Sequence, residues 1–235
     1  MSARVVLVHG SLSSAEEWSD YPDLLPDADV VRVDLPGHGQ RQGERFTTDE
    51  AVATIAAGVG DSDDPVVLVG HSLGGYMAMI YAARHPERLA GLALLGTSAD
   101  PGHPLGFVYR GFSWVSERID HVLLARIRNK IARWLRVPES QVPTAELYAV
   151  LPDAWGAVFA DVRPELLTRV ECPVLVLNGQ FDQMRVSERR FVKMAQRGEL
   201  ATVPKATHLA PLTHAPVVAG ILRGFIADVT RPATA

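Results

Sequence analysis

An α/β fold, with a mostly parallel central sheet of about six strands flanked by helices, is predicted for this 235-residue chain by two observations. Short apolar runs alternate with amphipathic stretches of helical length, which is the pattern of strand–helix–strand units. Several of the runs consist of Val, Leu and Ala without polar alternation, as expected of parallel strands that helices cover on both faces.

Six runs are expected to form strands. They are Arg4–Val8, Asp29–Val33, Val66–Val69, Leu89–Leu95, Val174–Leu177 and Leu200–Val203. The expected helices span Ala15–Leu25, Glu50–Gly58, Leu73–Arg84, Ser187–Arg197 and Pro211–Asp228. Thr47 and Glu50 have the spacing of a helix capping box, and Gly198 is suited to end a helix.

The composition is that of a globular protein, with 47% hydrophobic and 21% charged residues. A formal charge of −4 gives no reason to expect nucleic acid or an anionic membrane as a partner. The single cysteine, Cys172, excludes an internal disulfide and is expected to be buried and inert. No apolar run approaches the roughly 18 residues of a membrane span, and the first residues lack a signal-peptide pattern, so we expect a cytoplasmic location.

One connection is much longer than a strand–helix–strand unit needs. Almost eighty residues separate the runs that end at Leu95 and begin at Val174. Eight of the sixteen aromatic residues lie within residues 103–165, and the stretch from Arg110 to Arg136 carries a local charge of +5. We therefore expect residues 1–102 and 166–235 to form one core and residues 103–165 to form a helical cap inserted in it.

The segment Gly70–Gly75, with the sequence GHSLGG, follows an expected strand and precedes an expected helix. This is the G-x-S-x-G pattern in the context it requires, because a serine on a sharp strand-to-helix turn is held with its hydroxyl exposed. The helix N-terminus also presents free N–H groups near the charge that develops during acyl transfer. Ser72 is therefore the candidate nucleophile.

Acyl transfer at a serine also needs two N–H donors for the oxyanion. In this pattern the backbone of Leu73 supplies one, and the loop after His9-Gly10 is placed to supply the other from the backbone of Ser11. We expect His9 itself to orient the loop. The alternative is that the loop is an ordinary turn.

The serine needs a base, and the base needs an orienting acid. Both are expected after later strands, in the chain order Ser, Asp, His. Asp182 follows the run that ends at Leu177, and His208 follows the run that ends at Val203. The competing residues are Asp100, which follows an earlier strand, and His214, which is expected in the last helix and at the surface.

These segments resemble, in order, the motifs of serine hydrolases of the α/β-hydrolase family. The resemblance also includes Asp34–Gly39 (DLPGHG), Asn178–Asp182 (NGQFD) and Ala206–His208 (ATH), and it covers the chain apart from the expected cap. It implies a catalytic triad of Ser72, His208 and Asp182 with oxyanion donors Ser11 and Leu73. His38 is expected to be structural. Because the first strand leads directly to His9-Gly10, the family's opening β-hairpin is expected to be absent, as in the compact branch that holds methyl esterases.

The resemblance implies an enzyme that cleaves a carboxylic ester through an acyl-enzyme on Ser72. A thioesterase, lactonase, C–C hydrolase or cyclase would use the same triad, and a ligand receptor that retains a hydrolase pocket is a further alternative. Leu209 stands where related hydroxynitrile lyases carry a lysine, which argues against a lyase. No metal or other cofactor is predicted, the expected partner is a small-molecule ester or thioester, and the oligomeric state stays open.

The expected substrate contacts come from the cap and from two leucines near the triad. They are Leu12, Phe107, Trp114, Trp134, Trp155, Phe159 and Leu209. The alternative for the aromatic residues is that they pack cap helices against each other. The basic side chains of Arg126, Arg128, Lys130 and Arg133 would attract an anionic substrate, or else form a solvated helix face.

Overall fold

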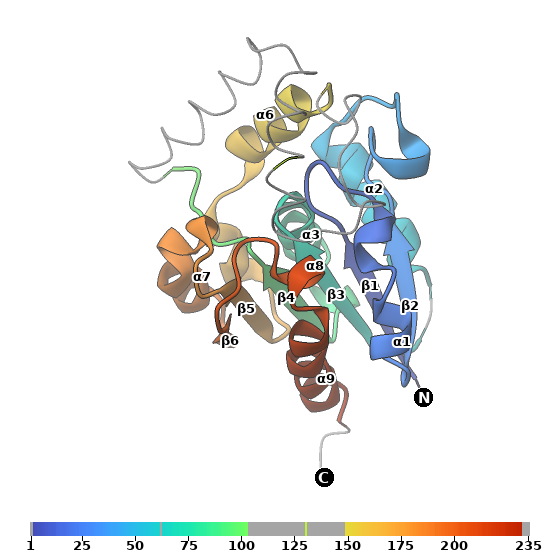
Figure 1. The fold of residues 1–235 in the computed structure, drawn as a ribbon, viewed down its shortest axis with the longest axis vertical. Coiled ribbons are helices and arrows are strands. Elements are labelled where there is room, and N and C mark those ends of the chain that lie inside the picture. The colour runs from blue at the N-terminus through green and yellow to red at the C-terminus, as the bar shows by residue number, and fades with distance from the viewer. Residues whose placement is uncertain (1, 62, 103–129, 131–148, 232–235) are drawn as a thin grey trace.

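The structure is a computed structural model that describes residues 2–61, 63–102, 130 and 149–231. Its sheet has six parallel strands in the order β2-β1-β3-β4-β5-β6 (Figure 1). The strands are β1 (Ala3–Val8), β2 (Ala28–Val33), β3 (Val66–His71), β4 (Gly91–Leu95), β5 (Val174–Gly179) and β6 (Gly198–Val203). The predicted fold class and all six predicted strands are confirmed.

Seven α-helices of the described residues surround this sheet. They are α1 (Tyr21–Leu24), α2 (Thr48–Val59), α3 (Leu73–Arg84), α6 (Leu151–Asp161), α7 (Glu188–Met194), α8 (Ala210–Thr213) and α9 (Ala215–Thr230). Short 3₁₀ turns span Ala15–Trp18, Gly39–Arg41, Pro86–Arg88, Pro164–Arg169 and Gln183–Ser187. No helix in this part of the chain is long and apolar enough to cross a membrane.

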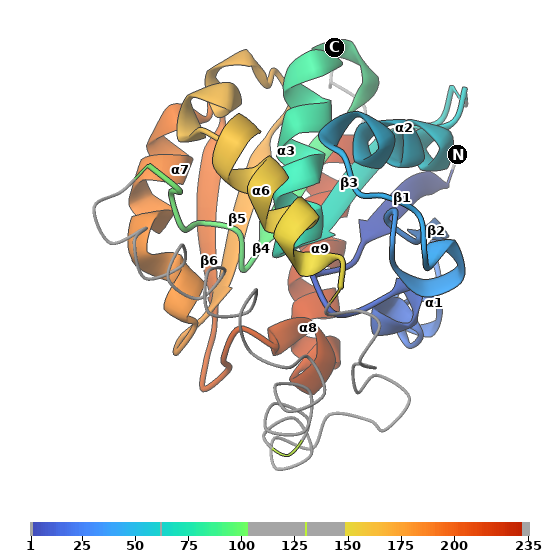
Figure 2. The same ribbon diagram turned by 90° about the horizontal axis from the view of Figure 1, so that it is seen from above.

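Helices cover both faces of the sheet, which explains why its inner strands lack polar alternation. Helices α2, α3, α6 and α7 lie on one face and α1, α8 and α9 on the other (Figure 2). Alternate residues of β1 divide between the two cores: Val6 and Val8 belong to the first, and Val5 and Leu7 to the second. A strand that is buried on both faces needs apolar side chains at every position.

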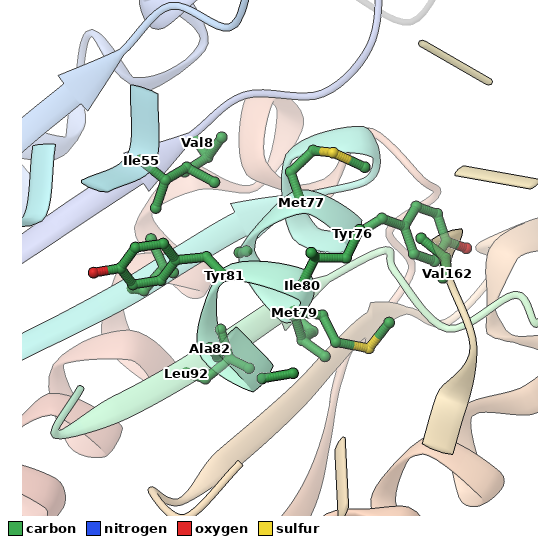
Figure 3. Close-up of a cluster of buried hydrophobic side chains, with 14 of the residues drawn as sticks. Val8, Ile55, Tyr76, Met77, Met79, Ile80, Tyr81, Ala82, Leu92 and Val162 are labelled. Atoms are coloured by element: carbon green, nitrogen blue, oxygen red, sulfur yellow. The ribbon is translucent and has the colours of Figure 1, made fainter. Parts of the chain in front are cut away.

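Helix α3 is the most enclosed helix next to the sheet. Every residue from Leu73 to Ala83 is buried. Its side chains Tyr76, Met77 and Ile80 pack in one cluster with residues of β1, α2 and β4 (Figure 3). Since α3 begins directly after Ser72, this packing fixes the position of the residue that the sequence marks as the nucleophile.

Two predicted helices are each divided into two shorter elements, and in each case a proline lies at the start of the second element. The expected helix Ala15–Leu25 is a 3₁₀ turn followed by α1, which has Pro22 in its first turn. The expected helix Pro211–Asp228 is divided at His214, so that Pro216 lies in the first turn of α9. Proline is tolerated in a first turn but clashes with the preceding turn inside a helix.

The role predicted for Gly198 is wrong. Helix α7 ends at Met194 with Ala195 as its C-cap, and Gly198 begins β6. A Cβ atom on Gly198 would lie 2.3 Å from the carbonyl oxygen of Val192. The glycine therefore allows the strand to start close against the helix.

Other local predictions are confirmed. The Thr47 side chain accepts the backbone N–H of Glu50 at the start of α2, as its position in the capping box requires. Cys172 is buried, and burial raises the pKa of its thiol to about 11. Most of the expected cap, residues 103–129 and 131–148, lies outside the described residues.

Candidate active site

Ser72 lies on a sharp turn between β3 and α3. Its backbone has φ 50° and ψ −115°, a strained conformation for a residue with a side chain. Its N–H donates to the carbonyl oxygen of Leu95 at 2.8 Å, which ties the turn to the neighbouring strand β4. Gly74 makes the turn possible, because a Cβ atom there would lie 2.4 Å from the carbonyl oxygen of His9.

The structure brings Ser72, His208 and Asp182 together. The Nε2 atom of His208 lies 3.0 Å from the Oγ atom of Ser72. Its Nδ1 atom lies 3.0 and 3.1 Å from the two carboxylate oxygens of Asp182. Because a carboxylate accepts, the His208 Nδ1–H donates to Asp182, which leaves Nε2 free to accept the serine hydroxyl proton.

Asp182 is held as a buried carboxylate. Burial alone would raise its pKa, but the hydrogen bond and charge of His208, the backbone N–H of Met184 and the nearby His71 together lower it. The Met184 N–H donates to Oδ1 at 2.7 Å. The side chain therefore stays ionised and fixes the tautomer of His208.

The topology explains why residues so far apart in sequence meet. Ser72 follows β3, Asp182 follows β5 and His208 follows β6, and all strands of the sheet are parallel. Loops after parallel strands gather at one edge of the sheet, where α/β proteins place their binding sites. The loop after β1, which carries Ser11, emerges at the same edge.

His9 holds the loop after β1, as predicted. Its Nε2 atom accepts the backbone N–H of Leu35 at 3.0 Å, so Nδ1 carries the proton and donates to the carbonyl oxygen of Gly10 at 2.8 Å. Burial lowers the pKa of His9 and favours this neutral form. In the same loop Leu12 is buried and has φ 61°, so the backbone after Ser11 turns sharply.

His38 packs beside His9 and belongs to the same frame. The two ring centroids are 5.0 Å apart, and the Nδ1 atom of His38 lies 2.9 Å from the carbonyl oxygen of Pro36. Burial lowers the pKa of His38 to about 3, so the ring is neutral. This arrangement agrees with the structural role that was expected for it.

The two competing residues have other partners than Ser72 and His208. Asp100 is paired with Arg190 at 2.6 Å and also accepts the N–H of Gly102. His214 is half-buried between α8 and α9, where its Nδ1 atom lies 2.9 Å from the hydroxyl of Thr213. His214 therefore precedes the last helix rather than lying inside it.

The predicted substrate contacts are only partly described. Phe107, Trp114 and Trp134 lie outside the described residues. Trp155 and Phe159 lie on α6 with ring centroids 6.0 Å apart, and Trp155 packs against the core beneath α6. Leu209 directly follows His208, is half-buried and precedes the first turn of α8.

Sequence reasoning missed two buried polar residues at this edge, Glu17 and His71. The carboxylate of Glu17 lies 2.6 Å from the Nδ1 atom of His71, and both side chains are almost fully buried. His71 stands inside the GHSLGG motif, where its position next to Ser72 was the signal that could have found it. Nothing in the sequence distinguishes Glu17 from Glu16, which is exposed.

Comparison with known proteins places this site in a family. The model of the alpha/beta hydrolase family matches residues 5–221. A pimeloyl-[acyl-carrier protein] methyl ester esterase of Neisseria meningitidis (serogroup B, strain H44/76) is 28% identical over 95% of this chain and 92% of its own. A 2-succinyl-6-hydroxy-2,4-cyclohexadiene-1-carboxylate synthase of Enterobacter sp. (strain 638) is 36% identical over 43% of this chain and 38% of its own.

One solved structure is similar to this chain in both sequence and fold. The thermophilic esterase of Thermogutta terrifontis is 26% identical, with a TM-score of 0.77, over 97% of this chain and 91% of its own. The family model spans the sheet, the strained serine turn and the histidine that faces it. The chain belongs to the alpha/beta hydrolase family.

Proposed function

We propose that this protein is a serine hydrolase that cleaves a carboxylic ester through an acyl-enzyme on Ser72. The observation that carries the proposal is the 3.0 Å contact between the Oγ atom of Ser72 and the Nε2 atom of His208 on a strained turn. Nucleophile and base within hydrogen-bond reach, with the base oriented by a third group, are the recognised elements of this chemistry. The esterases among the similar proteins support the same reaction class.

The first half of the reaction acylates the serine. As the Oγ atom of Ser72 attacks the ester carbonyl, its proton passes to Nε2 of His208, and Asp182 stabilises the resulting imidazolium. The oxyanion is held by the backbone N–H groups of Ser11 and Leu73. Leu73 is the first residue of α3, and the first N–H groups of a helix have no acceptor within the helix. The leaving alcohol takes this proton from His208 as the C–O bond breaks.

The second half regenerates the enzyme. Water attacks the acyl-enzyme while His208 removes one of its protons, and the same two N–H groups hold the second oxyanion. Collapse of this intermediate releases the carboxylic acid and returns the proton to Ser72. A carboxylate nucleophile would be needed for an alkyl-enzyme ester, so the serine limits the chemistry to acyl-type substrates.

A second candidate is a cyclase, lactonase, thioesterase or C–C hydrolase that uses the same triad. The partial match to the Enterobacter synthase favours keeping this candidate, because that protein is named for a synthase rather than an esterase reaction. Both candidates share Ser72, His208 and Asp182, so a substrate panel of esters, thioesters and lactones separates them. A ligand receptor with a retained pocket would turn over none of these substrates.

Labelling with a fluorophosphonate tests the proposal. We expect the wild-type protein to be labelled at one serine and to hydrolyse short p-nitrophenyl esters, and Ser72→Ala to lose both properties because Ser72 is the hydroxyl that faces Nε2 of His208. Ser19→Ala, which removes an exposed serine at the end of a 3₁₀ turn, serves as the control and should be labelled like the wild type. Labelling that survives in Ser72→Ala would refute the assignment of the nucleophile.

A further inference from the structure

Next to the three proposed catalytic residues lies a second, almost fully buried pair of polar side chains. Glu17 comes from the 3₁₀ turn after β1, and His71 is the last residue of β3. Their side chains are 1% and 4% exposed, and the Oε1 atom of Glu17 lies 2.6 Å from the Nδ1 atom of His71. The proposed mechanism uses neither residue, although both lie at the catalytic edge of the sheet.

The hydrogen bonds of the pair determine where its protons are. The Nε2 atom of His71 lies 3.0 Å from the carbonyl oxygen of His208, which can only accept, so Nε2 carries a proton. The second carboxylate oxygen of Glu17 accepts the backbone N–H of Gly10 at 3.0 Å. Burial alone would lower the pKa of His71, but the charge and hydrogen bond of Glu17 outweigh it and raise the pKa. Burial would raise the pKa of Glu17, but His71 and the Gly10 N–H lower it, so an imidazolium faces a carboxylate.

The pair joins three segments of the proposed active site. Gly10 directly precedes the oxyanion donor Ser11, His71 directly precedes Ser72, and the His208 carbonyl belongs to the loop of the base. Gly10 also packs directly against the His71 ring, since a Cβ atom on Gly10 would lie 2.9 Å from Nδ1. A shift of either side chain would therefore move the oxyanion loop or the base relative to the nucleophile.

The pair also places a positive charge next to the proposed base. The ring centroids of His71 and His208 are 4.9 Å apart. The other titratable groups that face the pair are Asp182, an anion that interacts with both histidines, His9, which is neutral, and Tyr21, which burial keeps protonated by raising its pKa. The ring of His71 therefore packs directly against the ring of the proposed base.

We propose that Glu17 and His71 are positioning residues of the active site: their ion pair holds the Ser11 loop and the His208 loop in place relative to Ser72. This inference rests on the proposed function, because it assigns the pair a role in that reaction. Two buried charges are expensive to bring together, and a pair of apolar residues of similar volume would often be as stable. A role in placing the reacting groups gives a reason for keeping the charges.

The variant Glu17→Gln tests the charge without breaking the contacts. A glutamine carbonyl can still accept the Gly10 N–H, and its amide can donate to Nδ1 of a neutral His71 whose Nε2–H still reaches the His208 carbonyl. We expect kcat to fall by roughly three- to tenfold with KM nearly unchanged, because the hydrogen bonds can re-form but the ion pair that fixes the two loops is lost. Asp29→Asn, at the opposite end of the sheet in an exposed pair with Arg4, is the control and should leave kcat unchanged.

The double variant Glu17→Met/His71→Phe tests the positioning. It keeps the buried volume apolar and removes all three hydrogen bonds of the pair, and a melting curve establishes that it is folded. We expect kcat to fall by roughly ten- to a hundredfold with KM changed less than about threefold, because misplaced reacting groups lower the rate more than they weaken binding. A purely structural pair would change the melting temperature and leave kcat of the folded protein as it is.

Two results would count against the inference in different ways. Ser72-dependent hydrolysis whose kcat is unchanged by both substitutions would overturn the positioning role and leave the proposed function standing. A wild-type protein without Ser72-dependent hydrolysis would overturn both. Nitrogen-15 NMR of the His71 ring adds a measurement that does not depend on turnover: a neutral ring at pH 6 in the wild type would overturn the ion pair.

Discussion

Asp182 and Asp100 are both buried carboxylates that follow strands of the sheet, and they differ in their partners. Asp182 accepts from the Nδ1 atom of His208, whereas Asp100 is neutralised by Arg190. Both follow strands that end at this edge, so the sequence alone left both as candidates for the orienting acid. The distinction rests on a side-chain contact between the loop after β4 and α7 that only the folded chain contains.

The variant Asp182→Asn tests this distinction. An asparagine amide can donate to Nδ1, which would favour the tautomer of His208 that cannot accept the Ser72 proton. We expect kcat to fall by roughly 10³–10⁴-fold while the melting temperature changes little. Asp100→Asn is the matched control: it breaks the pair with Arg190, so it should lower stability but keep kcat within a few-fold. The reverse pattern of activities would make Asp100 the orienting acid.

Residues whose function depends on one partner were the hardest to predict. Ser72, Asp182 and His208 stand in short motifs after strands, and the motif positions alone placed them correctly at one edge. Glu17 has no motif, and its role depends on a contact with a residue 54 positions later in the chain. A single sequence does not contain that pairing.

At the scale of elements, the connection from β3 to α3 is shaped by close backbone approach. The start of α3 passes so near the end of β1 that Gly74 has no room for a side chain. Helix α9, on the other face of the sheet, carries Gly224 at a position where an added Cβ atom would meet nothing within 4 Å. Gly74 therefore cannot carry a side chain, whereas Gly224 has room for one. The sequence does not reveal this difference.

Alanine substitutions at these two glycines should change stability in opposite directions. Gly74→Ala forces its Cβ against the carbonyl oxygens of Val8 and His9, so we expect a loss of about 1–3 kcal/mol in the free energy of unfolding, with reduced activity. Gly224→Ala should gain about 0.4–1 kcal/mol, because it restricts the unfolded chain without meeting an obstacle. Urea denaturation measures both, and a stable, fully active Gly74→Ala protein would contradict the close approach.

The strands were easier to predict than the helices for a physical reason. A strand buried on both faces is an unbroken apolar run, and the runs of the inner strands β1, β3, β4 and β5 are of this kind, whereas the edge strands β2 and β6 carry exposed polar residues such as Asp29 and Thr202. The apolar spacing typical of a helix continues through Pro22 and Pro216. The helix itself does not, because each proline lies in the first turn of a new helix. The prolines were visible in the sequence and were the signal to divide both helices.

At the scale of the whole molecule, charge is distributed unevenly along the chain. The net charge of −4 combines the +5 of the stretch from Arg110 to Arg136 with a strongly acidic remainder. Of the four basic residues predicted to meet an anionic substrate, Lys130 is the one within the described residues, and it is exposed. Basic side chains that face solvent raise the local concentration of anionic substrates, an effect that salt screens.

A salt series with matched substrates tests whether this stretch selects an anionic substrate. We compare a methyl ester whose acyl chain ends in a carboxylate with a neutral ester of the same length, from about 20 to 500 mM NaCl. If the stretch attracts the anion, kcat/KM for the charged ester should fall by roughly three- to tenfold across the series and stay nearly constant for the neutral ester. Replacing Arg126, Arg128, Lys130 and Arg133 by glutamine should flatten the first curve without changing the second. Equal, salt-independent rates for the two esters would instead identify these residues as a solvated helix face with no part in substrate choice.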